Sequence, residues 1–242
     1  MERMTADATA WRVLEHGPLE RLEDNLWRVE GALPNMALRR VMTVVRMADG
    51  RLVIHSAIAL PDELMAQIEA WGRPSYLLVP NAYHRLDAPA YKARYPEIVV
   101  VCPRTARKAV EKVVPVDMTY EQFVGDDTVT LSTFAGTGGR EGALVVRHGE
   151  RASLVLNDLV FNMPHVPGFV GFMLKHVTKS SGGPQISRIA RMTIVKDRAT
   201  LARELEALAD TQGLCRIVVS HHETIGDAPA DVLRREARTL AG

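Results

Sequence analysis

The segment Leu154-Val155-Leu156-Asn157-Asp158 is a short apolar run that ends on a carboxamide and a carboxylate. Three other runs also stop on a residue that can bind a metal ion or move a proton: Leu52 to His55, Tyr76 to His84, and Ile217 to His222. Runs of this kind are typical of buried strands, and open α/β folds place their ligand sites at strand ends. The sequence therefore predicts an α/β protein with functional groups at the rim of a sheet.

The pattern between these runs alternates between strands and helices, as in sheets that are covered on both faces. Asp49-Gly50 predicts a hairpin turn, because this pair supplies the positive φ that such turns need. We expect one compact domain over residues 1–242, with its core between about 20 and 240. Strands are expected at 26–30, 42–47, 52–55, 76–79, 98–102, 128–134, 143–147, 152–156 and 215–219, and helices at 61–71, 88–94, 104–112, 198–209 and 230–240.

Composition indicates an ordinary globular protein, with 47% hydrophobic and 24% charged residues. The net charge of +1 gives no field that would favour nucleic acid or an anionic membrane, so we expect neither as a partner. Cys102 and Cys215 lie in apolar runs and are interpreted as buried free thiols, which suits a reducing compartment. The first ten residues lack the order of a secretory signal, so the expected location is cytoplasmic.

The segment from Met163 to Ile189 differs from the rest of the chain. Glycine and proline punctuate it, yet it carries apolar side chains between Phe169 and Leu174. Loops of this length are usually functional or pack on a partner. Two interpretations stay open: a short helix docked on the core, or a lid or homodimer contact.

Several short strings occur in a characteristic order: Asn25-Leu26-Trp27, Ile54-His55-Ser56, Pro80-Asn81 with His84, Asn157-Asp158-Leu159-Val160-Phe161-Asn162, and Ser220-His221. In this order the chain resembles a divergent branch of the metallo-β-lactamase fold superfamily, from about Asn25 to the last helix. The resemblance implies an αββα sandwich of two mixed sheets. It also implies descent from metal-dependent hydrolases.

The metal-binding motif of that fold is degenerate in this chain. Active members use a His-x-His-x-Asp-His loop, whose imidazoles and carboxylate hold one or two zinc ions and activate water. The matching loop here is Asn81-Ala82-Tyr83-His84-Arg85-Leu86. By this resemblance Asn81 and Tyr83 replace histidines, Arg85 replaces the aspartate, and His84 is one position out of register. An intact dinuclear zinc site is therefore not expected.

Two ligand positions of the resembled fold survive. Asp158 matches the bridging aspartate and His221 the late histidine, whereas His55 stands where an aspartate is usual. A carboxylate at the end of a buried strand needs a partner, which favours a site role for Asp158. Because adjacent strand residues point to opposite sides, we expect His221 rather than His222 to face the site.

The first functional hypothesis is a metallo-hydrolase-like protein with a reduced, mononuclear site. One divalent ion (zinc, iron or manganese) would be held by Asp158 and His221, completed by His84 or His55, which leaves a position open for water. Asp158 and His84 would be catalytic, and the reaction would be hydrolysis of a small ester, amide or phosphoester.

The second hypothesis is a metal-free pseudoenzyme. Arg85, with Asn81 and Tyr83, would bind substrate or a small anion, because a guanidinium repels a metal ion and attracts carboxylate or phosphate. An Arg85–Asp158 ion pair would stand in place of the ion. Instead of an anion, the protein could bind a protein partner through the segment from Phe169 to Leu174. Structural roles for His84 and His55, as hydrogen-bonded loop residues, also stay open.

Overall fold

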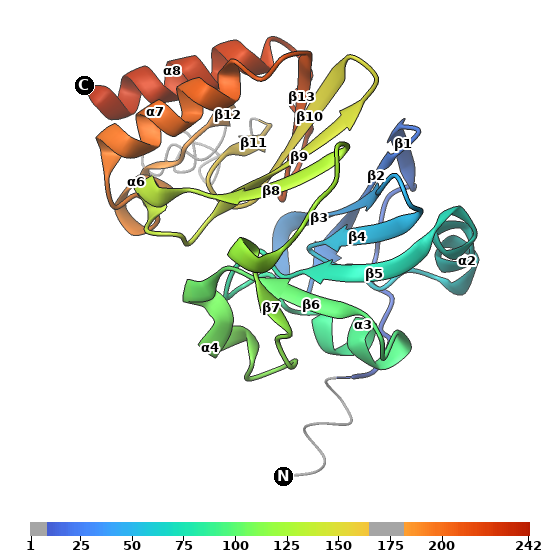
Figure 1. Ribbon diagram of the computed structural model, residues 1–242. Coiled ribbons are helices and arrows are strands. Elements are labelled where there is room, and N and C mark those ends of the chain that lie inside the picture. The colour runs from blue at the N-terminus through green and yellow to red at the C-terminus, as the bar shows by residue number, and fades with distance from the viewer. Residues whose placement is uncertain (1–8, 165–181) are drawn as a thin grey trace. The chain divides into compact units, whose positions relative to one another are not determined.

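The computed structural model describes residues 9–164 and 182–242 (Figure 1). The chain divides into two compact units, Met1–Leu131 and Ser132–Gly242. Each unit contributes a mixed β-sheet with helices, so the predicted α/β class with two mixed sheets is confirmed. That the whole chain behaves as a single domain stays a prediction.

The first unit contains a seven-stranded sheet in the order β1-β2-β3-β4-β5-β6-β7. Strands β1 to β4 pair antiparallel, and β4 to β7 pair parallel. The strands predicted between residues 26 and 102 are all present. Their bounds are β1 (Glu20–Glu23), β2 (Leu26–Leu33), β3 (Met36–Arg46), β4 (Arg51–His55), β5 (Arg73–Leu78), β6 (Val99–Cys102) and β7 (Met118–Thr119).

The predicted hairpin joins β3 to β4. Gly50 adopts a φ of 82°, a left-handed conformation that favours glycine. The backbone N–H of Arg51 donates to Asp49 Oδ1 over 3.0 Å, and this hydrogen bond lowers the pKa of the Asp49 carboxyl. The turn therefore fixes the register in which β4 carries His55 to the end of its strand.

Helices α2 (Asp62–Trp71) and α3 (Ala88–Arg94) supply the core of the first unit. Met65 and Ile68 of α2 belong to the same fully buried cluster as Leu52, Ile54 and Leu77 of the sheet. Both helices agree with the predicted ranges. The predicted helix over 104–112 was too long: a 3₁₀ turn, η1 (Arg104–Ala106), leads into the single turn α4 (Arg107–Val110). The β-branched residues that follow and Pro115 disfavour further helix.

A buried ion pair ties three segments of the first unit together. Arg40 Nη2 lies 2.6 Å from Asp87 Oδ2, with side chains only 5% and 10% exposed. Arg40 also donates to the carbonyls of Ala32 and Ala57, and Asp87 accepts the backbone N–H of Ala59. Strand β3, the segment after β4 and the start of α3 are thus joined by one charge pair whose polar atoms are well satisfied.

The second unit contains a four-stranded sheet in the order β13-β10-β9-β8, in which the boundary between the units falls within β8, and the strands predicted for it are present. Strand β10 pairs antiparallel with β9 and parallel with β13. A separate two-stranded sheet was not predicted. The bounds are β8 (Val129–Thr133), β9 (Gly142–His148), β10 (Arg151–Leu156) and β13 (Leu214–Val219), with β11 (Phe161–Met163) and β12 (Gly183–Gln185) in the small sheet.

Helices α7 (Arg198–Ala209) and α8 (Pro229–Ala241) lie side by side over the second sheet (Figure 1). Leu201, Leu205 and Leu233 form one buried cluster with Leu154 and Ile217 of the strands. Both helices were predicted, whereas the short helix α6 (Arg188–Thr193) and the 3₁₀ turns η2 (Tyr120–Gln122) and η3 (Ala135–Thr137) were not.

Turn η3 packs tightly on α7. A Cβ added to Gly136 would lie 2.4 Å from the backbone nitrogen of Leu201, so any side chain there would force η3 and α7 apart. Glu204 of α7 accepts the backbone N–H groups of Ala135 and Gly136 over 2.7 and 3.0 Å. Glycine is therefore required for this contact.

Part of the segment from Met163 to Ile189 is described. It contributes β12 and the first residues of α6. The apolar stretch from Phe169 to Leu174 lies outside the described residues, and so do the lid and homodimer contact predicted for it.

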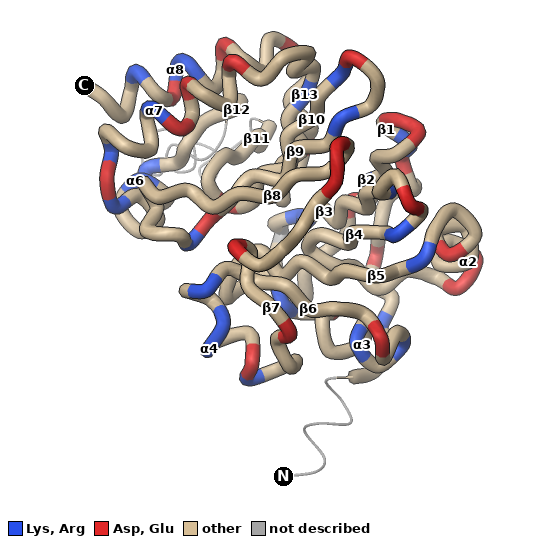
Figure 2. The backbone as a smooth tube through the Cα atoms, in the orientation of Figure 1, with Lys and Arg blue, Asp and Glu red and all other residues tan. Residues whose placement is uncertain are grey.

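Charges of both signs are interspersed along the helices and loops of each unit (Figure 2). Within residues 9–164 and 182–242, no helix is long and apolar enough to cross a membrane. Both cysteines are free thiols; Cys102 is buried and Cys215 is half-buried. Burial raises the pKa of the Cys102 thiol to about 12.

We expect the Asp87→Ala substitution to lower the free energy of unfolding by about 3–5 kcal/mol, because it leaves the Arg40 guanidinium buried and without its countercharge. Urea denaturation measures this change. The matched control is Glu111→Gln, which removes an exposed i,i+4 pair with Arg107 and should cost less than about 1 kcal/mol. Equal effects of the two substitutions would contradict this assignment.

We also expect the two thiols to differ in reactivity. At pH 8, Ellman's reagent should modify Cys215 first, because the folded state keeps Cys102 protonated and covered. A Cys215→Ala variant should show only the slow reaction, and urea should make both sites fast. Rapid modification of Cys102 in the folded protein would be the opposite outcome.

Candidate functional site

Asp158 and His221 meet at one edge of the second sheet. Strands β10 and β13 are parallel neighbours, with Leu156 opposite Val219, so the residues that follow them leave the sheet side by side. His221 Nε2 lies 3.0 Å from Asp158 Oδ1. The two side chains are 6% and 15% exposed. The structure thus brings together the two residues that match surviving ligand positions.

The imidazole of His221 is held on its flat side by a phenylalanine. The rings of Phe161 and His221 are parallel within 2°, with centroids 5.3 Å apart. The next residue, His222, has a φ of 63° and pairs with Asn162 through an isolated bridge. Of the two adjacent histidines, His221 is the one that contacts Asp158, as expected. Sequence reasoning did not find Phe161, although it lies three residues after Asp158.

A buried acid, Glu141, contacts Asn157, the residue that precedes Asp158. Glu141 and Asn157 are each 2% exposed, and Asn157 Nδ2 lies 3.4 Å from Glu141 Oε1. Sequence reasoning did not select Glu141. The available signal was its position in the segment 138–143, which by the sequence resemblance stands where the resembled fold has a histidine-bearing turn.

His84 belongs to the first unit and is fixed at its backbone and at its ring. Asn81 Oδ1 accepts the backbone N–H groups of Tyr83 and His84 over 2.8 and 3.1 Å. The ring nitrogen Nδ1 of His84 lies 2.9 Å from Ser56 Oγ. The side chain of Asn81 therefore shapes its own loop, and its predicted contact with substrate stays a prediction.

The other predicted residues of this loop point to different surroundings. Tyr83 is 86% exposed. The Arg85 guanidinium donates to the carbonyl of Ala109. Asp158 has a partner in its own unit, and the predicted Arg85–Asp158 pair stays a prediction.

His55 is the last residue of β4 and is only 4% exposed. It lies opposite Thr43 of β3. Since strand residues alternate, its side chain is on the face opposite that of Ile54, which packs in the helix-covered core. Its role as a metal ligand stays a prediction.

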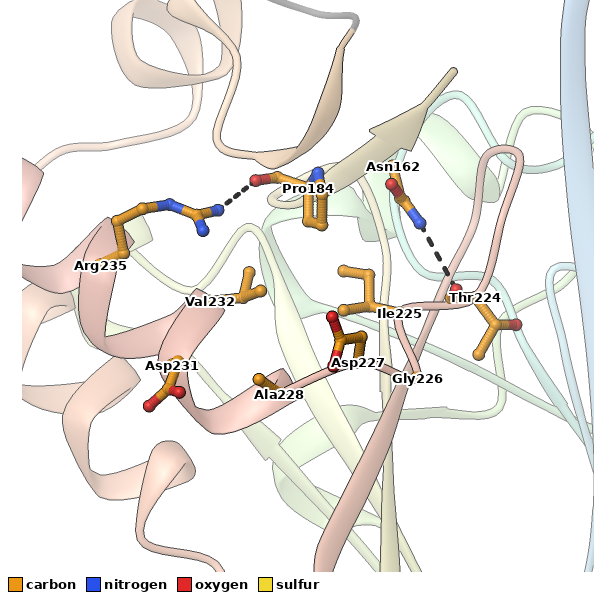
Figure 3. Close-up of a pocket in the computed structure, with 10 residues that line it drawn as sticks. All are labelled: Asn162, Pro184, Thr224, Ile225, Gly226, Asp227, Ala228, Asp231, Val232 and Arg235. Atoms are coloured by element: carbon orange, nitrogen blue, oxygen red, sulfur yellow. Dashed lines mark hydrogen bonds between the residues drawn. The ribbon is translucent and has the colours of Figure 1, made fainter.

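A hollow of about 390 Å³ is lined by residues of β11, β12, the segment 224–228 and α8 (Figure 3). Its walls include Ile225, Val232 and Pro184, and Asn162 Nδ2 donates to the carbonyl of Thr224. Because side chains of a strand alternate, Phe161 points toward His221 and Asn162 lines the hollow. Neither Asp158 nor His221 is among the residues that line the hollow.

The donor atoms of Asp158 and His221 fit a divalent metal. Carboxylate oxygen and imidazole nitrogen bind zinc at about 2.0–2.2 Å in a tetrahedral arrangement, which places two ligand atoms roughly 3.3 Å apart. The observed separation of 3.0 Å is close to this value. The pair can therefore hold either a proton or a metal ion with little movement of the side chains.

Solved structures share the fold of this chain. DIM-1 metallo-β-lactamase is 12% identical, with a TM-score of 0.61 over 94% of this chain and 99% of that protein. FIM-1 metallo-β-lactamase from Pseudomonas aeruginosa, in its mono-zinc form, is 13% identical, with a TM-score of 0.58 over 96% and 99% of the two chains. A metallo-β-lactamase from Erythrobacter litoralis is 13% identical, with a TM-score of 0.60 over 93% and 100%.

No protein family and no curated protein matches the chain by sequence. The structural likeness shows the metallo-β-lactamase fold, as the sequence resemblance implied. At this level of identity, activity does not follow from the fold.

We expect Asn81→Ala to loosen the loop that carries His84, because Tyr83 and His84 lose an acceptor for their backbone N–H groups. Loss of about 1 kcal/mol should speed hydrogen exchange of these two amides roughly fivefold. NMR-detected exchange measures the effect. Asn81→Asp keeps an acceptor oxygen and should leave both rates near those of the wild type; unchanged rates in Asn81→Ala would contradict the assignment.

Proposed function

We propose that this protein is a metallo-hydrolase-like protein with a reduced, mononuclear metal site. Its support is the pairing of a carboxylate and an imidazole, Asp158 and His221, at adjacent strand ends of a metallo-β-lactamase fold. Both side chains are shielded from water, which strengthens their electrostatic interaction with a cation.

The proposed third ligand is His84. It belongs to the loop that carries ligands in the resembled fold, and it is partly exposed, whereas His55 is almost fully buried. Three protein ligands leave one position of a tetrahedral ion open, as catalytic zinc sites require. A set of two imidazoles and one carboxylate also suits iron and manganese.

A bound divalent ion would polarise a carbonyl or phosphoryl oxygen and generate a nucleophile from water near neutral pH. The chain's own contribution is to hold the donor atoms in place. Phe161 fixes the plane of the His221 ring, and Asp158 fixes its direction. We propose a small ester, amide or phosphoester as substrate.

The chain's small net charge, with both signs interspersed, supports a small molecule rather than nucleic acid as partner. A cytoplasmic location stays a prediction from the sequence.

Elemental analysis of protein purified without chelator or an affinity-column metal tests the proposal. We expect about one zinc, iron or manganese ion per chain in the wild type. Asp158→Ala and His221→Ala should lose it, and His84→Ala should bind the ion more weakly. His148→Ala is the control, because His148 lies opposite Arg151, at the far end of β10 from Asp158, and should keep the ion.

Added metal should also raise the melting temperature of metal-free wild type but not of Asp158→Ala. Absence of metal in the wild type, with no change in melting temperature on titration with these three ions, would reject the proposed site. The metal-free alternative, with a small anion bound at Arg85, would then be the hypothesis to pursue.

A further inference from the structure

We infer that Ser56 is a positioning residue that sets the tautomer and orientation of His84, so that His84 binds the ion through Nε2. The role of His84 as a metal ligand in this inference rests on the proposed function. Its structural basis is the 2.9 Å contact between Ser56 Oγ and His84 Nδ1, which lies entirely within the first unit.

Ser56 is held firmly enough to orient a ring. It follows β4 directly and is 3% exposed. Its backbone N–H donates to the carbonyl of Leu78 over 3.0 Å, which extends the pairing between β4 and β5 by one residue. The hydroxyl therefore sits at a defined place relative to the sheet, and the His84 ring is positioned against it.

The backbone of Ser56 is in an unfavourable conformation. Its φ of 56° is left-handed, and serine is less stable there than glycine. Among the described residues, the non-glycine residues with positive φ are Asn35, Ser56, His222 and Ala228. Two of these directly follow a histidine: Ser56 follows His55, the last residue of β4, and His222 follows His221, two residues after the end of β13. Backbone strain of this kind is typically kept where function needs the side chain.

Because Ser56 contacts Nδ1 of His84, the contact can determine which ring nitrogen carries the proton. When Ser56 Oγ accepts a hydrogen bond from Nδ1–H, the lone pair of His84 is on Nε2. Metal-binding histidines usually donate their other ring N–H to an acceptor in this way, which fixes the tautomer and the ring orientation. Asn81 fixes the backbone of the same residue, so His84 is constrained from both sides.

A nucleophilic role for Ser56 would require different geometry. A nucleophilic hydroxyl must reach substrate, and Ser56 is only 3% exposed. In the serine–histidine pair of serine proteases the hydroxyl contacts Nε2, whereas here it contacts Nδ1. The contact is therefore suited to orienting the imidazole.

The test uses metal-free, ¹⁵N-labelled full-length protein. Long-range ¹H–¹⁵N correlation of the His84 ring should show the Nδ1–H tautomer in the wild type and a mixture of tautomers in Ser56→Gly. Glycine removes the hydroxyl and also relieves the left-handed strain, so this variant is expected to fold. Ser75→Ala is the control, because the half-buried Ser75 donates its hydroxyl to the carbonyl of Arg73, two residues away in the same strand.

Titration with zinc separates this inference from the proposed function. Ser56→Gly should bind zinc roughly 10- to 100-fold more weakly than the wild type, whereas Asp158→Ala should lose binding. If the wild type binds none of zinc, iron and manganese, the proposed function fails, and the tautomer measurement on metal-free protein still decides the role of Ser56. An unchanged tautomer in Ser56→Gly, or modification of Ser56 by a fluorophosphonate probe, would overturn the inference.

Discussion

The buried pair between Arg40 and Asp87 is the constraint on which the first unit depends. Two charges removed from water are stable only when paired and hydrogen-bonded, so these groups fix the distance between β3 and the start of α3. Ser56 and His84 lie in two segments that both end at Asp87. The segment after β4 carries Ser56 and reaches Ala59, whose backbone N–H donates to Asp87. The segment after β5 carries His84 and leads into Asp87 at the start of α3. A contact of 2.9 Å between a serine and a histidine 28 residues apart can persist because its supporting segments are held at their ends.

In the second unit the equivalent constraint is strand pairing. Parallel pairing of β10 with β13 brings Asp158 to His221 across 63 residues of sequence. Sequence reasoning found both residues, because an apolar run that ends on a polar group is visible in the sequence. It could not find the stacking of Phe161 on His221, since β11 has only three residues and no periodicity to detect.

For the fold too, features with a local sequence pattern were predicted, and features that depend on tertiary contacts were not. Helices 88–94 and 198–209 were predicted with the bounds that the structure has: Pro96 limits the first, and the second has one apolar face with Leu201 and Leu205 buried. The expected helix at 104–112 failed because helical composition alone does not outweigh a run of β-branched residues before proline. Side-chain contacts such as that of Ser56 with His84 depend on tertiary structure, and a single sequence gives no direct sign of them.

Turn η3 offers a packing signature that is independent of chemistry. The chain contains no His-x-His-x-Asp-His string, so motif searches built on those ligands will pass over proteins like it. The constraint on Gly136 is steric, because the backbone of α7 beside it leaves room for a hydrogen atom only. A homologue that has lost every ligand but keeps this packing must still carry glycine there, together with an acid one helical turn after the contact, as Glu204 is here. Such a pair would identify proteins with this packing even where metal-binding residues are absent.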